Sequence, residues 1–141
     1  MNTSHLLLWT DGSSRLHTTG LGGIGVVGKY GDETVFKVCE NIGPATNNVA
    51  EYTAVTRGLE RALDIGAERV TLRIDSRVVY RHYLGTSKCR AAHLIPLLDC
   101  MRQLMSNFDV GIERIPTKEN READRLAKAG SLKVPKQQEG P

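Results

Sequence analysis

The chain has 141 residues, of which 40% are hydrophobic and 25% are charged. This length and balance are typical of one globular domain with its own core, and they argue against a disordered or fibrous protein. The formal net charge is only +3, from 19 Lys and Arg residues against 16 Asp and Glu residues, so charge alone does not identify a nucleic-acid-binding protein.

The beginning of the chain has no apolar run long enough for a membrane span or a secretory leader. Its longest apolar run extends only from Leu6 to Trp9. The cysteines Cys39, Cys89 and Cys100 are widely spaced and form no CxxC pair, so we expect free thiols, with one disulfide as the alternative. These features favour a cytoplasmic protein, with a monomer as the default.

The first part of the chain predicts three antiparallel strands. The first is an apolar run that ends at Asp11-Gly12, a dipeptide typical of turns. A glycine-rich stretch precedes the second strand, and Gly31-Asp32 forms a tight turn before the third. We expect these strands at residues 5–10, 24–30 and 34–40.

The rest of the chain alternates helices with two further strands. Apolar residues at helical spacing predict a long helix that has Asn48 as its N-cap and ends at Gly66. A compact apolar strand, two helices, a strand that ends at Pro116 and a final helix that ends at Gly130 follow. We expect these elements at residues 48–65, 69–74, 76–84, 91–105, 109–115 and 120–129.

This order of elements predicts an α/β domain with a mixed sheet over residues 1–130. The helix between the third and fourth strands makes the fourth strand parallel to one of the first three, through a right-handed crossover. Residues 131–141 are polar, and we expect them to form a flexible C-terminal tail.

Four acidic residues stand at the ends of the predicted elements: Asp11, Glu51, Asp75 and Asp124. Each alone has a structural explanation, because turns, capping boxes and helix N-termini favour acids. If the first and fourth strands are parallel neighbours, however, their carboxyl ends lie at the same edge of the sheet. Carboxylates gathered there would repel each other unless divalent cations bound them, and ligand oxygens without Cys or His suit Mg²⁺ or Mn²⁺.

The segments around these acids resemble the four motifs of type 1 ribonuclease H, in the same order and spacing. The segments are Thr10-Asp11-Gly12-Ser13, residues 46–52 (TNNVAEY), Ile74-Asp75-Ser76 and residues 119–127 (ENREADRLA). One Asp-Gly-Ser sequence carries little weight, whereas four motifs in register are specific. The resemblance covers about residues 5–130 and implies an RNase H-like fold, with a five-stranded mixed sheet of order 3-2-1-4-5 flanked by helices.

The resemblance also implies the chemistry. It implies an endoribonuclease that hydrolyses the RNA strand of RNA–DNA hybrids with two Mg²⁺ ions, for which Mn²⁺ can substitute. The products would carry 5′-phosphate and 3′-hydroxyl ends. The four acids would hold the metals. Hybrid contacts would come from Gly12, Ser13, Asn47, Asn48 and Ser76, and a DNA phosphate would bind Thr46. For Asn47 and Asn48 helix capping is the alternative, and both roles are compatible at a helix N-terminus.

Two features depart from the best-known bacterial members of the family. Those members carry a histidine in a flexible loop, whereas no histidine lies between Asp109 and Asp124 here. They also have a basic protrusion that contains tryptophan, whereas the segment from Arg81 to Ala92 is short and lacks tryptophan. We therefore expect weaker hybrid binding than in relatives that carry the protrusion.

Two other functions stay open. A proofreading exonuclease of the same superfamily usually begins with an Asp-x-Glu pair, and Gly12-Ser13 after Asp11 argues against it. A non-catalytic module that binds hybrids or RNA would keep the fold without needing all four acids, and all four are present.

Overall fold

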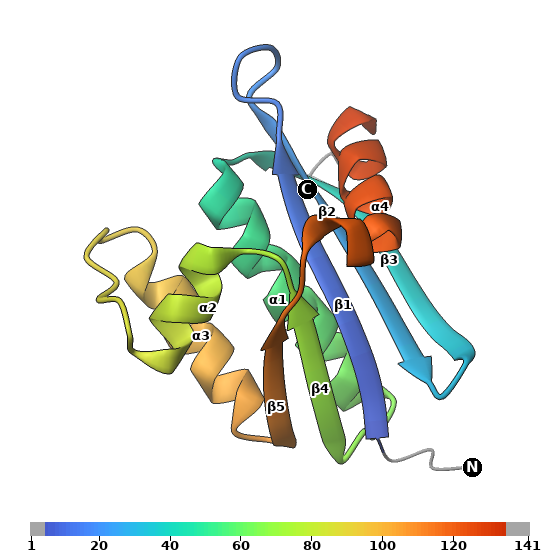
Figure 1. The fold of residues 1–141 in the computed structure, drawn as a ribbon. Coiled ribbons are helices and arrows are strands. Elements are labelled where there is room, and N and C mark those ends of the chain that lie inside the picture. Colours follow the sequence, from blue (N-terminus) through green and yellow to red (C-terminus); the bar gives the residue numbers. More distant parts are fainter. Residues whose placement is uncertain (1–4, 135–141) are drawn as a thin grey trace, which may run out of the picture.

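The computed structural model describes residues 5–134, which form a five-stranded mixed sheet with helices on both faces (Figure 1). The strands are β1 (His5–Ser14), β2 (Leu21–Tyr30), β3 (Glu33–Pro44), β4 (Arg69–Ile74) and β5 (Asp109–Arg114). The helices are α1 (Asn47–Asp64), α2 (Arg77–Leu84), α3 (Ile95–Met105), the 3-10 turn η1 (Thr117–Glu119) and α4 (Arg121–Leu132). The strand order β3-β2-β1-β4-β5 confirms the predicted topology.

The central strand β1 has one antiparallel and one parallel neighbour. It pairs antiparallel with β2 and parallel with β4, so that Trp9 lies opposite Val27 on one side and Arg73 on the other. Because β1 and β4 are parallel, their carboxyl ends lie at the same edge of the sheet. This confirms the strand arrangement on which the predicted gathering of the acids depends.

The main core lies between the sheet and the helices α1, α2 and α3; Figure 1 shows α1 behind the sheet and α2 and α3 to the left of β5. Alternate side chains of β1 point into this core, so the fully buried Leu6 and Leu8 alternate with the half-buried Leu7 and Trp9. On α1 the buried Tyr52, Val55, Leu59 and Ala62 cover the same face, as the periodicity of the sequence predicts, whereas Leu63, which follows the same spacing, is exposed.

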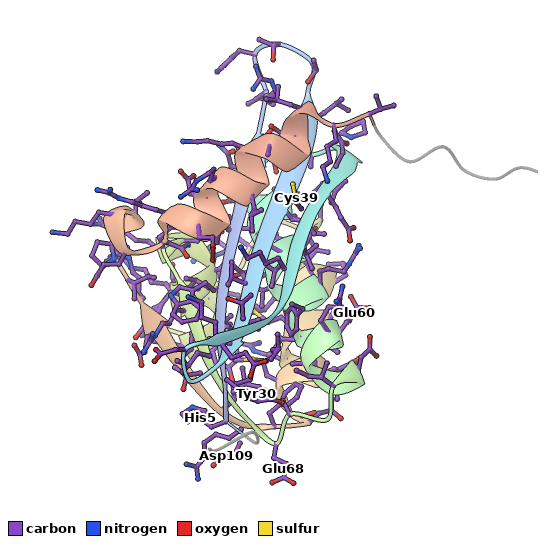
Figure 2. All side chains as sticks on the ribbon, turned by 90° about the vertical axis from the view of Figure 1, so that its right-hand side faces the viewer. His5, Tyr30, Cys39, Glu60, Glu68 and Asp109 are labelled. Carbon is purple, nitrogen blue, oxygen red and sulfur yellow. The ribbon has the colours of Figure 1, made fainter. Side chains whose placement is uncertain are left out.

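Helix α4 lies across the opposite face of the sheet, where Figure 2 shows it above Cys39. The helix backbone touches β2, because a Cβ atom at Gly23 or Gly25 would overlap carbonyl oxygens of α4. The glycine-rich stretch was expected to precede the second strand, but β2 already begins at Leu21. These glycines are therefore strand residues that allow close helix packing.

Two element ends at glycines were predicted wrongly. Strand β1 does not turn at Asp11-Gly12, because its pairing with β2 continues without a break to Ser14. Helix α4 does not end before Gly130 but continues to Leu132. A Cβ atom at Gly130 would overlap the Glu40 backbone, so this glycine allows α4 to pack against β3.

Two helix starts also differ from the prediction. The N-cap of α1 is Thr46, whose hydroxyl accepts a hydrogen bond from the Val49 N–H, and not Asn48. Helix α3 begins at Ile95 rather than Ala91, because the preceding residues form a turn and Pro96 stands at the start of the helix. Of the predicted tail, residues 131–132 are helical and residues 135–141 lie outside the described part of the chain.

The three cysteines are free thiols, as predicted, and Cys39 donates a hydrogen bond to the Leu126 carbonyl of α4. In the part of the chain that the structure describes, no helix has both the length and the apolar character that a membrane span needs.

The close contact of α4 with β2 predicts that Gly25→Ala destabilises the fold, since the new methyl group would push the helix away. We expect a loss of about 2 kcal/mol or more in the free energy of unfolding, measured by urea denaturation. The matched control is Gly111→Ala in β5, where a Cβ atom would meet nothing within 4 Å. That change should stay within about 0.5 kcal/mol of the parent, and equal losses in both variants would contradict the packing role of Gly25.

Candidate metal centre

Three of the four predicted acids meet at one point. Asp11, Glu51 and Asp75 each offer a carboxylate oxygen, and these oxygens lie within 4.8 Å of one another. Asp11 belongs to β1, Glu51 lies on α1, and Asp75 directly follows the last residue of β4. The cluster therefore depends on the parallel pairing of β1 with β4 and on the packing of α1 against β1.

Gly12 allows α1 to come this close. A Cβ atom at Gly12 would overlap the backbone of Ala50 and Glu51, so any side chain there would push Glu51 away from Asp11. Gly12 was predicted as a contact to the hybrid. Its structural role was missed, because an Asp-Gly pair in the sequence also fits an ordinary turn.

Asp124 lies at the border of this cluster. It stands in the first turn of α4, on the opposite face of the sheet from α1, and its side chain is close enough to hydrogen-bond the Asp11 carboxyl. It also forms an ion pair with Lys128, with 3.1 Å between Nζ and Oδ2. Asp11, which is 4% exposed, thus lies between acids from both faces of the sheet.

Burial and mutual repulsion change the acidity of the two innermost carboxyls. Desolvation raises the pKa of Asp11 to about 10, with further increases from Glu51 and Asp75. Desolvation also raises the pKa of Glu51 to about 7, although hydrogen bonds from Asp11 and the Gly12 backbone act in the opposite direction. These carboxylates therefore lack a compensating positive charge.

The donor atoms fit a hard divalent cation. The Oε2 atom of Glu51 is buried without a hydrogen-bond partner, which is costly unless a positive group binds it. The cluster contains only carboxylates, and carboxylate oxygens suit Mg²⁺ or Mn²⁺, whereas zinc sites usually include Cys or His.

Several of the residues predicted to contact the hybrid also stabilise the local backbone through helix caps and hydrogen bonds. Thr46 caps α1, and the neighbouring Asn47 accepts a hydrogen bond from the Ser14 N–H at 3.0 Å. Ser76 caps α2 by accepting a hydrogen bond from the Val79 N–H. Ser13 and Asn48 are half-buried. Contact of all these residues with a hybrid stays a prediction.

Sequence reasoning gave no role to Asn120, which it placed at the first position of the last helix and inside the fourth motif. Its side chain is 1% exposed, and its Nδ2 donates to the Thr10 carbonyl at 3.0 Å. Burial of an amide against β1 leaves no local signal in a sequence, because helix starts commonly carry asparagine.

The family model described as Reverse transcriptase-like matches residues 9–130. The N-terminal RNase H domain of Rv2228c from Mycobacterium tuberculosis is 31% identical with a TM-score of 0.84, over 90% of this chain and 98% of that chain. The RNase H1 of Halobacterium salinarum is 33% identical with a TM-score of 0.84, over 89% of this chain and 96% of that chain. This chain belongs to the type 1 ribonuclease H family.

Longer relatives contain this ribonuclease H domain as one part. The chain spans 34% of the length of the bifunctional protein Rv2228c, with 34% identity over 124 residues that make up 86% of this chain. It spans 59% of the Halobacterium salinarum Ribonuclease HI, with 36% identity over 119 residues, or 83% of this chain. A further structural relative, LC11-RNase H1, is 28% identical with a TM-score of 0.82, over 89% of this chain and 96% of that chain, and was solved in complex with an RNA/DNA hybrid.

The raised pKa values predict how the stability of this ribonuclease H domain depends on pH without metal. Folding binds protons to Asp11 and Glu51 more tightly, so their stabilising contribution is complete below about pH 4 and is lost as the pH rises through about 7 and then about 10. In EDTA, the melting temperature should therefore fall between about pH 5 and about pH 8. Thermal unfolding followed by circular dichroism measures this fall.

In EDTA at about pH 8, the variant Asp11→Asn should be more stable than the parent by about 1 kcal/mol or more. Folding of the parent must protonate Asp11, whose pKa rises to about 10, whereas asparagine needs no proton. Asp109→Asn is the control, since Asp109 is exposed and pairs with Arg69 at the far end of β4, and it should keep the parent's pH dependence. The same pH dependence in Asp11→Asn and the parent would contradict the clustering of the acids.

Proposed function

We propose that this protein is an endoribonuclease that hydrolyses the RNA strand of RNA–DNA hybrids. The observation that carries the proposal is the meeting of Asp11, Glu51 and Asp75 at one sheet edge, with Asp124 beside them, in a domain of the ribonuclease H family. The hybrid complex of LC11-RNase H1 supports the class of substrate.

The four acids would hold two Mg²⁺ ions, for which Mn²⁺ would substitute. When bound, these ions would supply activation of water and stabilisation of the leaving 3′-oxygen, which yields 5′-phosphate and 3′-hydroxyl ends. The buried, unpartnered Glu51 Oε2 supports this assignment, because a metal would satisfy it.

The chain itself contributes rigid placement of the carboxylates. Asp11 lies in β1 opposite Gly25 of β2, two residues beyond the end of the pairing with β4, and Glu51 lies on a helix in backbone contact with Gly12. Asp75 is held between the end of β4 and the Ser76 cap of α2. Carboxylates held by regular elements need little rearrangement during the reaction, which lowers the barrier when charge develops on the phosphate.

Hybrid recognition would use the residues that flank the acids. The exposed start of α1 carries Thr46 and Asn47, and its free backbone N–H groups favour a phosphate. The side-chain amide of Asn48 can both donate to and accept from a 2′-hydroxyl, which separates RNA from DNA. Ser13, Gly12 and Ser76 adjoin Asp11 and Asp75 and would contact the same backbone.

The proposal predicts that only the RNA strand of a hybrid is cut, and only with a divalent metal. The test incubates end-labelled hybrid, double-stranded RNA and double-stranded DNA with Mg²⁺, Mn²⁺ or EDTA, and analyses the products on a gel. Asp11→Asn should abolish cleavage, by about a thousandfold or more, while the protein stays folded and still binds the hybrid.

The matched control is again Asp109→Asn, which should cut at the parental rate because Asp109 lies at the amino end of β5, away from the cluster. Cleavage in EDTA, equal cleavage of double-stranded DNA, or a fully active Asp11→Asn variant would remove the proposed function.

A further inference from the structure

Asn120 is a buried asparagine with an unusual set of hydrogen bonds. It occupies the N-cap position of α4, where an asparagine side chain usually accepts a hydrogen bond from the first helical turn, but here it makes no such bond. Its Nδ2 instead donates to the Thr10 carbonyl of β1, and its Oδ1 is buried without a partner.

This arrangement is not the one that would stabilise α4 best. An unused cap costs about 1 kcal/mol, and a buried acceptor without a partner costs about 1–3 kcal/mol. A serine or threonine that capped the helix would avoid both costs. The side chain is therefore placed for its bond to β1.

The bond joins the two elements that carry Asp11 and Asp124. Thr10 directly precedes Asp11 in β1, and the Asn120 carbonyl accepts the Asp124 N–H at 3.0 Å within the first turn of α4. A shift of Asn120 would therefore move Asp124 with it. The amide sets how far the start of α4 stands from β1.

The geometry points to Asn120 as a positioning residue of the metal centre, an inference that rests on the proposed function. Asp11 and Asp124 must both be ionised to bind a metal, and their repulsion in that state pushes the start of α4 away from β1. The Asn120 amide opposes this movement and keeps Asp124 near Asp11, so that both can reach the same metals. Asn120 itself touches neither the acids' oxygens nor the substrate in this scheme.

A second asparagine provides a matched control for a purely structural role. Asn41 in β3 donates its Nδ2 to the Lys133 carbonyl at 2.8 Å, which fastens the other end of α4 to the sheet. The chemistry of the bond is the same and so is the helix, but the contact lies at the end of α4 remote from Asp124. Loss of either bond loosens α4, whereas only the Asn120 bond lies beside the acids.

The experiment measures Mn²⁺ binding to the whole chain by isothermal titration calorimetry, without any hybrid. Asn120→Ala should lower the Mn²⁺ affinity about tenfold or more, the usual size of effect for a group that orients metal ligands. Asn41→Ala should keep the parental affinity, although its melting temperature in EDTA falls. With hybrid present, the kcat of Asn120→Ala should be lower than that of the parent at low Mn²⁺ and should return to the parental value at high Mn²⁺. The KM for the hybrid should not change.

Asn120→Ser is the second variant if the alanine variant does not fold, since it leaves a smaller cavity and a hydroxyl that reaches less far. It should also lose Mn²⁺ affinity, by less than the alanine variant. Parental affinity in a folded Asn120 variant, or an equal loss of affinity in Asn41→Ala, would overturn the inference, and so would a parent that binds no Mn²⁺. A parent that binds Mn²⁺ but cuts no hybrid would remove the proposed function alone.

Discussion

The mutual repulsion of buried carboxylates is the constraint on which this structure depends. Asp11 is buried between Glu51 on one face of the sheet and Asp124 on the other, with Asp75 on the neighbouring strand. Lys128 pairs with Asp124, but the raised pKa values of Asp11 and Glu51 show that the charge of these two carboxylates is not compensated. The rest of the fold must hold these groups together until divalent cations bind.

Close backbone contacts hold the acidic residues together. Gly12 lets α1 lie against β1, and Gly25 lets the first turn of α4 lie against β2. Each contact brings one acid-bearing helix to the central part of the sheet, from opposite faces. The Asn120 side chain adds a direct bond between α4 and β1. Stability and site geometry are therefore not separable here, because the same contacts serve both.

The link between β5 and α4 shows how the site differs from the family's best-known bacterial members. It contains the single exposed 3-10 turn η1 and no histidine. Asp11, Glu51 and Asp75, three of the proposed metal ligands, lie outside this link, so their cluster forms without it. Asp124 follows the link and is joined to it through Asn120. A leaving group would have to take its proton from water or from another side chain.

The sequence by itself determined the order of the elements and pointed to the four acids, because apolar periodicity and short motifs are local signals. It misjudged Asp11-Gly12 and Gly130 as element ends, since a glycine that forms a turn looks the same as a glycine that admits a neighbouring backbone. Only the tertiary structure decided between these roles. It also decided that three acids meet with the fourth at their border, and that Asn120 faces β1, because such contacts join residues that lie far apart in the chain.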